Sequence, residues 1–179
     1  MKHHVISART EDLNETIRFA IVRVCVEAHQ EEDFNNLFNY ISSGGWHFLA
    51  HDNEQLVSHA VVTTRWLQLE GESPLKTAYI DAVATLPSYQ GQGLGSALMR
   101  QLAGDIDSEY DIACLETVRE TFYARLGWQT WRGPLAGRSE HGLIPTPEQQ
   151  GVMVLQLSKT PDLDLESLLS IECQPDRIW

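Results

Sequence analysis

A glycine-rich segment, Gln90–Ser96, most constrains the fold of this chain of 179 residues. It follows the apolar, strand-like run Ala78–Ala84 and precedes a run with helical character. A glycine turn between a strand and a helix gathers main-chain N–H groups at the positive end of the helix dipole, which suits phosphate groups. Glycine also lets a ligand approach the backbone closely. The segment therefore predicts a phosphate-binding turn.

The spacing of the glycines excludes two common phosphate motifs. A dinucleotide-binding turn needs a third glycine where Ser96 stands, and a P-loop needs a lysine that the segment lacks. The pattern that fits is Q-x-x-G-x-G, from Gln90 through Gly93 to Gly95. For this segment alone, an ordinary strand–turn–helix connection is the alternative.

Length and composition predict one globular domain over residues 1–179. No apolar run approaches the ~20 residues of a membrane helix, and residues 1–5 lack the apolar core of a signal peptide. The net charge of −12 argues against a nucleic-acid partner and favours a cationic small molecule, although an acidic surface can serve solubility alone. Three widely spaced cysteines and seven histidines form no disulfide framework or metal motif, so we expect a cytoplasmic protein without a metal.

Apolar periodicity predicts an α+β fold. We expect strands at 5–8, 46–50, 56–64, 77–85, 112–115, 128–131 and 152–157. We expect helices at 17–28, 33–41 (or helical turns there), from the glycine segment to about 103, and at 121–126. Asp12 and Glu15 resemble a capping box before the first helix. Residues 133–151 are expected to be a loop, and the tail from Pro161 has no simple period. This order predicts a mixed, mostly antiparallel central sheet flanked by helices.

Two motifs together resemble the GNAT acetyltransferases. The Gln90–Gly95 pattern resembles their coenzyme A pyrophosphate loop, and Tyr123–Trp128 resembles their F-Y-x-x-x-G-F/W segment, whose tyrosine faces the sulfur of coenzyme A. The resemblance implies a single GNAT domain and acetyl-CoA as cosubstrate. It implies that acetyl-CoA meets Val83, Ala84, Gln90, Gly91, Gln92, Gly93, Leu94, Gly95 and Ser96.

Two residues are candidates for the chemistry of acetyl transfer. Asp81 stands inside a predicted strand, where carboxylates are uncommon, and it can take a proton from the attacking amine, more plausibly through water than directly. Tyr123 can protonate the departing thiolate, because a phenol has an ordinary pKa of ~10. The alternatives are a solvent-facing edge position for Asp81 and a packed core position for Tyr123. A main-chain N–H near Val83 is the expected donor to the thioester carbonyl.

The whole chain resembles one branch of this family, the aminoglycoside 2′-N-acetyltransferases. Five segments carry the resemblance: Glu32–Phe34, Ser43–His47, Tyr79–Ala82, Leu126–Gly133 and the terminal Trp179. The resemblance implies a homodimer and a small-molecule aminoglycoside substrate, with no membrane partner. It implies that the substrate site contains Asp33, Phe38, Asp81, Glu116, Glu148, Gln149, Arg177 and Trp179.

Departures from that branch indicate a less cationic substrate. Phe38 and Arg177 stand where the branch has aspartates, Asp81 replaces a glutamate, and a loop carboxylate is replaced near Gln149. Polycations need several carboxylates to replace their water. Kasugamycin has one free amine and an amidine with its own carboxylate, so Arg177 has a natural partner there. The kasugamycin-acetylating branch is our first expectation. Another aminoglycoside, another small amine, or a non-catalytic acetyl-CoA-binding module are the alternatives.

Overall fold

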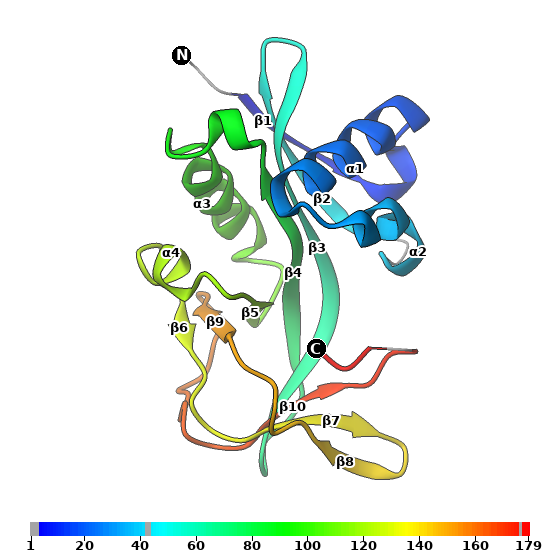
Figure 1. Ribbon diagram of the computed structural model, residues 1–179. Helices are drawn as coiled ribbons and strands as arrows, with labels where there is room; N and C mark the ends of the chain where they lie inside the picture. The colour runs from blue at the N-terminus through cyan, green and yellow to red at the C-terminus, as the bar shows by residue number, and fades with distance from the viewer. Residues whose placement is uncertain (1–3, 42–43, 176) are drawn as a thin grey trace. The chain divides into compact units, whose positions relative to one another are not determined.

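The computed structural model of the protein describes residues 4–41, 44–175 and 177–179; Ser43 of the sequence motif above lies outside them. The chain divides into two compact units, Met1–Thr63 with Ile80–Gly104, and Thr64–Tyr79 with Asp105–Trp179. Two long strands, β3 (Gln55–Leu69) and β4 (Leu75–Thr85), run from one unit into the other (Figure 1).

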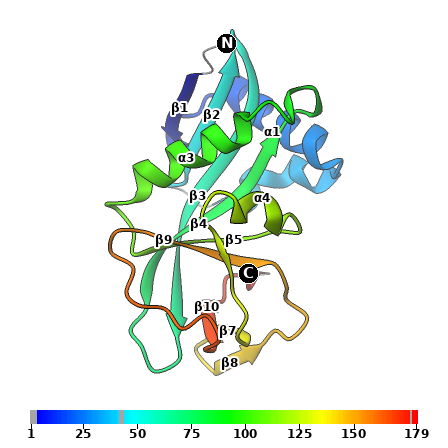
Figure 2. The same ribbon diagram turned by 90° about the vertical axis from the view of Figure 1, so that its left-hand side faces the viewer.

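The first unit is a small sheet between helices. Strand β2 (Trp46–Asp52) pairs antiparallel with β1 (His4–Arg9) on one side and with β3 on the other. Helices α1 (Glu15–His29) and α3 (Leu94–Ile106) lie on opposite faces of these strands (Figure 2). The predicted hairpin, the amphipathic first helix and the helix after the glycines are therefore confirmed.

The predicted capping box of α1 is wrong. Asp12 lies in a separate 3₁₀ turn, Thr10–Asp12, and Asn14 is the N-cap instead. The Asn14 side chain accepts a hydrogen bond from the N–H of Ile17 at 3.0 Å. This bond satisfies one of the donors that the first turn of a helix leaves without an internal partner. The segment predicted as a helix or helical turns at 33–41 forms a 3₁₀ turn, Glu32–Asn36, which begins one residue earlier, and the short helix α2 (Leu37–Tyr40).

The second unit contains most of the strands. Across it the order is β6 (Gln129–Thr130), β9 (Val152–Gln156), β5 (Ile112–Glu116), β4, β3, β10 (Leu169–Glu172), β7 (Leu135–Ser139) and β8 (Gly142–Pro145). Parallel pairing joins β4 to β5 and β10 to β7, whereas antiparallel pairing joins β10 to β3, β5 to β9, β6 to β9 and β7 to β8. The short helix α4 (Glu120–Ala124) precedes β6. The mixed, mostly antiparallel sheet of an α+β fold is confirmed.

One expectation for the second unit is wrong. Residues 133–151 are not a loop throughout, because β7 and β8 form an antiparallel hairpin within them. The tail, whose sequence has no simple period, contains strand β10, which pairs with both β3 and β7, with Ile171 opposite Leu67 and Gly137. Strand β10 is short and gains its partners from segments far away in the sequence. A local pattern does not reveal such pairing.

The core of the second unit includes the end of the chain. Trp179 is 6% exposed and belongs to a buried apolar cluster. Its other members are Leu67, Leu69, Tyr79, Ile112, Cys114, Trp131, Val152, Val154, Leu165, Leu169 and Ile171. The last residues are therefore held in the protein interior. Terminal segments are usually poorly ordered unless packing of this kind holds them.

Candidate functional site

The glycine turn after β4 is open and ends at the start of α3. Gly91 and Gly93 have φ of +74° and +83°, a left-handed backbone that favours glycine. A Cβ added at either position meets no atom within 4 Å, so the space beside both is open. The first helical bond runs from Ala97 N–H to the Gly93 carbonyl oxygen. The N–H groups that precede it in α3 are those that a helix start offers to an anion.

The side chains of the two glutamines in this turn donate hydrogen bonds to main-chain carbonyl oxygens nearby. Gln90 Nε2 donates to the carbonyl oxygen of Thr85 at 3.0 Å, and Gln92 Nε2 donates to that of Ser88 at 2.9 Å. Their side chains thus hold the backbone of the turn, which leaves its main-chain groups as the part that faces a ligand. The geometry fits a pyrophosphate, because the turn combines close backbone access with helix N–H groups.

Asp81 precedes a residue with an unusual backbone conformation within strand β4. Ala82 has φ of +49°, a left-handed conformation that is uncommon for a residue with a Cβ. The four carbonyl oxygens that follow Asp81 each accept a hydrogen bond from a side chain. The donors are His59 to Ala82 at 2.9 Å, His29 to Val83 at 3.1 Å, Ser58 to Ala84 at 2.7 Å and Gln90 to Thr85 at 3.0 Å. Side chains from α1, β3 and the glycine turn thus fix the backbone beside the half-buried Asp81.

Two further expected residues of the first unit lie near α2. Asp33 is exposed in the 3₁₀ turn Glu32–Asn36. The Phe38 ring contacts two side chains, with the Arg18 guanidinium 4.6 Å from its centroid and the centroid of the His47 ring 5.8 Å away. The aromatic ring at this position is therefore packed, whereas an aspartate here would place a carboxylate beside Arg18.

Tyr123 lies in the second unit, on α4. It is 7% exposed and contacts Phe122 and Trp128 edge to face, with ring centroids 4.9 and 6.0 Å apart. Burial raises the pKa of Tyr123 to about 12. The phenol therefore keeps its proton at neutral pH, as a general acid must.

Three other expected residues of this unit lie on strand ends and turns. Glu116 is exposed at the end of β5. Glu148 is exposed after β8, and Gln149 continues a turn in which its N–H donates to the Thr146 carbonyl oxygen. The hydroxyl of Thr146 accepts a hydrogen bond from Trp179 Nε1 at 3.0 Å. The 146–149 turn and the tail are therefore brought together.

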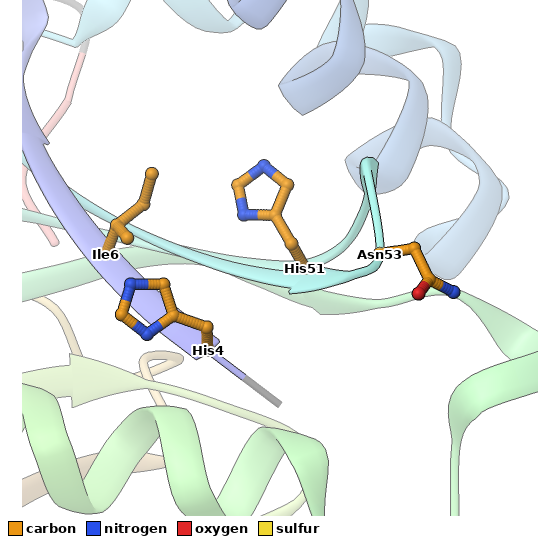
Figure 3. A pocket seen from close by; sticks show the side chains of 4 residues that line it. All are labelled: His4, Ile6, His51 and Asn53. Carbon is orange, nitrogen blue, oxygen red and sulfur yellow. The ribbon is translucent and has the colours of Figure 1, made fainter. Parts of the chain in front are cut away.

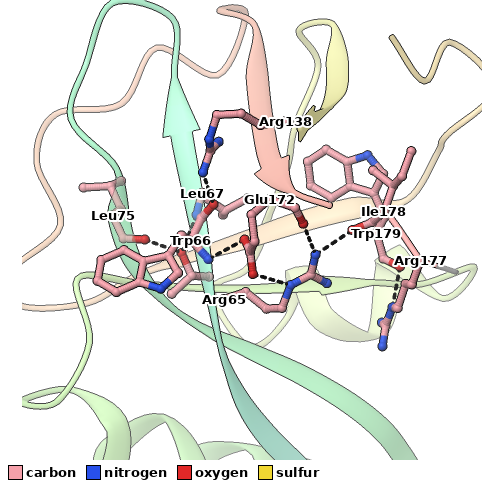
Figure 4. Close-up of polar contacts among 10 residues, drawn as sticks. Arg65, Trp66, Leu67, Leu75, Arg138, Glu172, Arg177, Ile178 and Trp179 are labelled. Carbon is pink, nitrogen blue, oxygen red and sulfur yellow. Dashed lines mark hydrogen bonds and ion pairs between the residues drawn. The ribbon is translucent and has the colours of Figure 1, made fainter. Parts of the chain in front are cut away.

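Arg65 anchors the tail from β3 (Figure 4). It is 1% exposed, and its Nε donates to a carboxylate oxygen of Glu172 at 2.8 Å. Its Nη2 donates to the carbonyl oxygens of Glu172 and Ile178 at 2.6 and 2.7 Å. The guanidinium groups of Arg65 and Arg177 lie 5.2 and 5.1 Å from the centroid of the Tyr79 ring. Arg177 Nε also donates to the Trp179 carbonyl oxygen at 2.5 Å.

The structure groups the expected residues by unit. The first unit holds Asp33, Phe38, Asp81, Val83, Ala84 and residues 90–96, and the second holds Glu116, Tyr123, Glu148, Gln149, Arg177 and Trp179. Within the first unit, Gln90 is bonded to the strand that carries Asp81. Within the second, Trp179 links Arg177 to the turn before Gln149.

The sequence did not reveal two buried polar residues of β3, His59 and Arg65. His59 and Arg65 are polar residues inside the apolar run of β3, and both are almost wholly buried. A titratable residue in such a run needs a partner when it is buried. A titratable residue inside an apolar strand is the same signal that singled out Asp81, and it also points to His59 and Arg65.

An open cavity of about 410 Å³ lies elsewhere in the first unit (Figure 3). His4, Ile6, His51 and Asn53 line it, and none of the expected site residues does. Among residues 4–41, 44–175 and 177–179, no three His, Cys, Asp or Glu side chains gather as a metal ion requires. No helix within those same residues is long and apolar enough to cross a membrane.

The family of the chain follows from its sequence and its fold. The model of the acetyltransferase (GNAT) domain matches residues 4–131. The chain therefore belongs to the GNAT acetyltransferase family, and it is an N-acetyltransferase. More particularly, it is 30% identical over 175 residues to an aminoglycoside 2′-N-acetyltransferase of Mycolicibacterium fortuitum, which covers 96% of this chain and 88% of that protein.

Solved structures share the fold at low sequence identity. The GNAT N-acetyltransferase YhbS from Escherichia coli, solved in complex with CoA, gives a TM-score of 0.65 at 15% identity, over 97% of this chain and 91% of that one. Eis1 from Mycobacterium abscessus gives 0.60 at 19% identity, over 74% of this chain. The chain spans about a third of the length of Eis1, with 32% of that chain covered.

Proposed function

We propose that this protein transfers the acetyl group of acetyl-CoA to the 2′-amine of an aminoglycoside antibiotic, with kasugamycin as the first candidate. The observation that carries the proposal is the open glycine turn at the start of α3, which follows the strand in which Ala82, next to Asp81, has a left-handed backbone. An anion site and a carboxylate thus occur within one short stretch of chain. The 30% identical aminoglycoside 2′-N-acetyltransferase supports the substrate class.

The glycine turn would hold the pyrophosphate of acetyl-CoA. Main-chain N–H groups of residues 91–96 donate to its oxygens, and the bonds from Gln90 and Gln92 keep the turn in shape. Beyond the turn, an N–H near Val83 or Ala84 would polarise the thioester carbonyl. Donors that are fixed before the reaction stabilise a developing oxyanion without reorganisation.

Asp81 would act as the general base of the transfer, and Tyr123 would act as the general acid. Asp81, through a water molecule, takes a proton from the substrate ammonium, so that the nitrogen lone pair can attack the thioester carbonyl carbon. A C–N bond forms, the nitrogen releases its second proton to solvent, and the C–S bond breaks as the tetrahedral centre collapses. Tyr123 gives its phenolic proton to the departing thiolate, and solvent restores that proton.

The second unit would supply selectivity for the substrate. Arg177 is a cation where the aminoglycoside branch has an aspartate, and it is held by the Tyr79 ring and the Trp179 carbonyl oxygen. A substrate with one free amine and a carboxylate complements such a group better than a polycation does. Glu116, Glu148 and Gln149 of the same unit would also contact the substrate. We propose substrate contacts for Asp33 and Phe38 as well, on the resemblance to the aminoglycoside branch.

An antibiotic panel on a sensitive strain tests the proposal. Expression of the chain should raise the inhibitory concentration of kasugamycin, and it should raise that of polycationic aminoglycosides less. Expression of the D81N variant at equal level should protect much less. Protection against polycationic aminoglycosides alone would contradict the kasugamycin assignment, and no protection at all would contradict the substrate class. We also propose a cytoplasmic location, on the cysteine usage of the sequence, and a homodimer, on the resemblance to this branch.

A further inference from the structure

The left-handed conformation of Ala82 needs structural support. For a residue with a Cβ, this conformation is unfavourable, because the Cβ comes too close to the following carbonyl oxygen. Such strain persists only where surrounding contacts determine it. Three described side-chain atoms lie near the Ala82 peptide: His59 Nδ1 at 2.9 Å and Cys25 Sγ at 3.8 Å from its carbonyl oxygen, and His29 Nε2 bonded to the next carbonyl. Of the contacts from His59 and Cys25 to the Ala82 carbonyl oxygen, that from His59 is the shorter.

The Ala82 carbonyl fixes the tautomer of His59. A carbonyl oxygen only accepts, so His59 Nδ1 carries the proton. In a neutral imidazole the other ring nitrogen is then an acceptor. Burial lowers the pKa of His59 to about 3, with a further lowering from His47, so the ring is neutral at pH 7. The side chain is fully buried.

The acceptor nitrogen of His59 in turn orients His47. His47 Nδ1 lies 2.9 Å from His59 Nε2 and must donate to it. Burial, with the nearby Arg18 charge, lowers the pKa of His47 to about 4, so its Nε2 accepts. That acceptor lies 3.0 Å from the Thr10 hydroxyl, which donates its single proton there. The chain of donors therefore runs in one direction, from Thr10 through both rings to Ala82.

We propose that His59 and His47 are positioning residues for acetyl transfer, acting through this directed chain of hydrogen bonds on the Ala82 carbonyl. The inference rests on the proposed function. Neither ring touches the reacting atoms in this scheme. They hold the peptide between Asp81 and Val83, and so aim the carboxylate on one side and the N–H groups on the other. Misplacement of a catalytic group by about 1 Å can cost 10²-fold in rate.

The neighbouring contacts agree with a positioning role. The main-chain N–H of Thr10 donates to the carbonyl oxygen of Gly45 at 2.9 Å, so the far end of the chain is anchored to main chain. At the near end, Cys25 Sγ lies 3.7 Å from His59 Nδ1, and burial raises the pKa of its thiol to about 12. A neutral thiol adds no charge beside the neutral imidazole.

Paired substitutions of His59 separate positioning from bulk packing. H59L fills the space without a donor, whereas the amide nitrogen of H59N can replace Nδ1 as donor to Ala82. We expect H59L to lower kcat about 10–100-fold, with KM for acetyl-CoA within about twofold of wild type. H59N should recover most of that loss. H51L, a histidine of β2 outside the chain of bonds, serves as the control and should retain wild-type kcat. Wild-type kcat in H59L, or equal losses in H59N and H59L, would overturn the inference.

Nitrogen NMR of the wild-type protein gives a test that needs no substrate. With ¹⁵N-labelled histidine, we expect both His47 and His59 to be protonated at Nδ1 and bare at Nε2 at pH 7. A proton on Nε2 of either ring overturns the directed chain, even if H59L does not fold. If the wild-type protein acetylates no amine, the proposed function fails, whereas the tautomers still decide whether this arrangement exists.

Discussion

Arg65 donates a hydrogen bond from Nη2 to the carbonyl oxygen of Ile178, at 2.7 Å. This contact joins a strand in the middle of the sheet to the second-to-last residue of the chain. Glu172 on β10 completes the arrangement, since it accepts from Arg65 Nε and from the N–H of Trp66. Arg65 thereby fixes the backbone of the segment that carries Arg177 and Trp179.

R65M should destabilise the protein and weaken the binding of the amine substrate. Removing one partner of a buried ion pair typically costs about 3–5 kcal/mol, because the other charge is left unpaired. Chemical denaturation measures this cost, and KM for the amine should rise while the Kd for acetyl-CoA stays unchanged. The double variant R65M/E172Q should recover part of the stability. A stable R65M protein with normal KM would show that the tail needs no such anchor.

Gly137 should tolerate no larger residue, because the tail packs on it. A Cβ there would lie 2.8 Å from Cys173 Sγ and 2.9 Å from Ile178 Cγ2. We expect G137A to lower the midpoint of thermal unfolding, and to raise KM for the amine more than KM for acetyl-CoA. G104A is a suitable control, because an added Cβ at Gly104 meets nothing within 4 Å. Equal kinetics for the two variants would argue against a role of the tail in the substrate site.

G93D should abolish the binding of acetyl-CoA. The new side chain brings a negative charge into the open space where the pyrophosphate is proposed to lie. Calorimetry with acetyl-CoA measures the effect. Gly71 offers a matched control, because its φ of +79° and open surroundings resemble those of Gly93. G71D carries the same backbone strain, so retained affinity in G71D and lost affinity in G93D are expected. Equal affinities would place the phosphates elsewhere.

D81N should lower kcat by about 10²–10⁴-fold, the usual contribution of a general base, with acetyl-CoA binding intact. Y123F should lower kcat less, because water can protonate the thiolate in its place. D105N, on an exposed position of α3, is the control for a general charge effect. Stopped-flow detection of thiol release measures the rates. A D81N protein with wild-type kcat across pH would mean that the base lies elsewhere.

Stability should fall between pH 6.5 and about pH 4 because of the buried histidines. In the folded state the pKa of His47 is lowered to about 4 and that of His59 to about 3, whereas both have an ordinary pKa of 6.5 when unfolded. The unfolded chain therefore binds protons first as pH drops, and the free energy of unfolding falls by up to about 1.4 kcal/mol per pH unit for each histidine. Urea unfolding at several pH values measures the slope. The H59N variant should show a smaller slope, and an unchanged slope would contradict the assignment.

Local chemistry explains why much of the first unit was predictable. The glycines of the turn, the helix that follows and the strand before it all carry their signals within a few residues, since helix spacing, turn chemistry and backbone permissiveness are local properties. The one local error, Asp12 as the cap of α1, arose because two polar residues near a helix start compete for the same role. Asn14 has the extended backbone that a cap requires.

Non-local pairing explains most of what was missed. Strand β10 gains its partners from β3 and β7, and the bonds of Arg65 reach across more than a hundred residues to Glu172 and Ile178. The contact of His59 with Ala82 likewise depends on how β3 meets β4. The spacing of residues along the sequence does not indicate which distant segments come into contact. A polar residue within an apolar strand is the one signal that points to them, because burial demands a partner.

The most direct test of the central claim is thiol release by the purified protein with acetyl-CoA and kasugamycin, followed by NMR of the product. The account predicts one thiol released per antibiotic molecule and a single new amide at the 2′-nitrogen, with D81N slower by about 10²–10⁴-fold. Turnover of kasugamycin at another nitrogen would contradict the proposed regiochemistry. The absence of thiol release with kasugamycin and with every other aminoglycoside offered would contradict the proposed function.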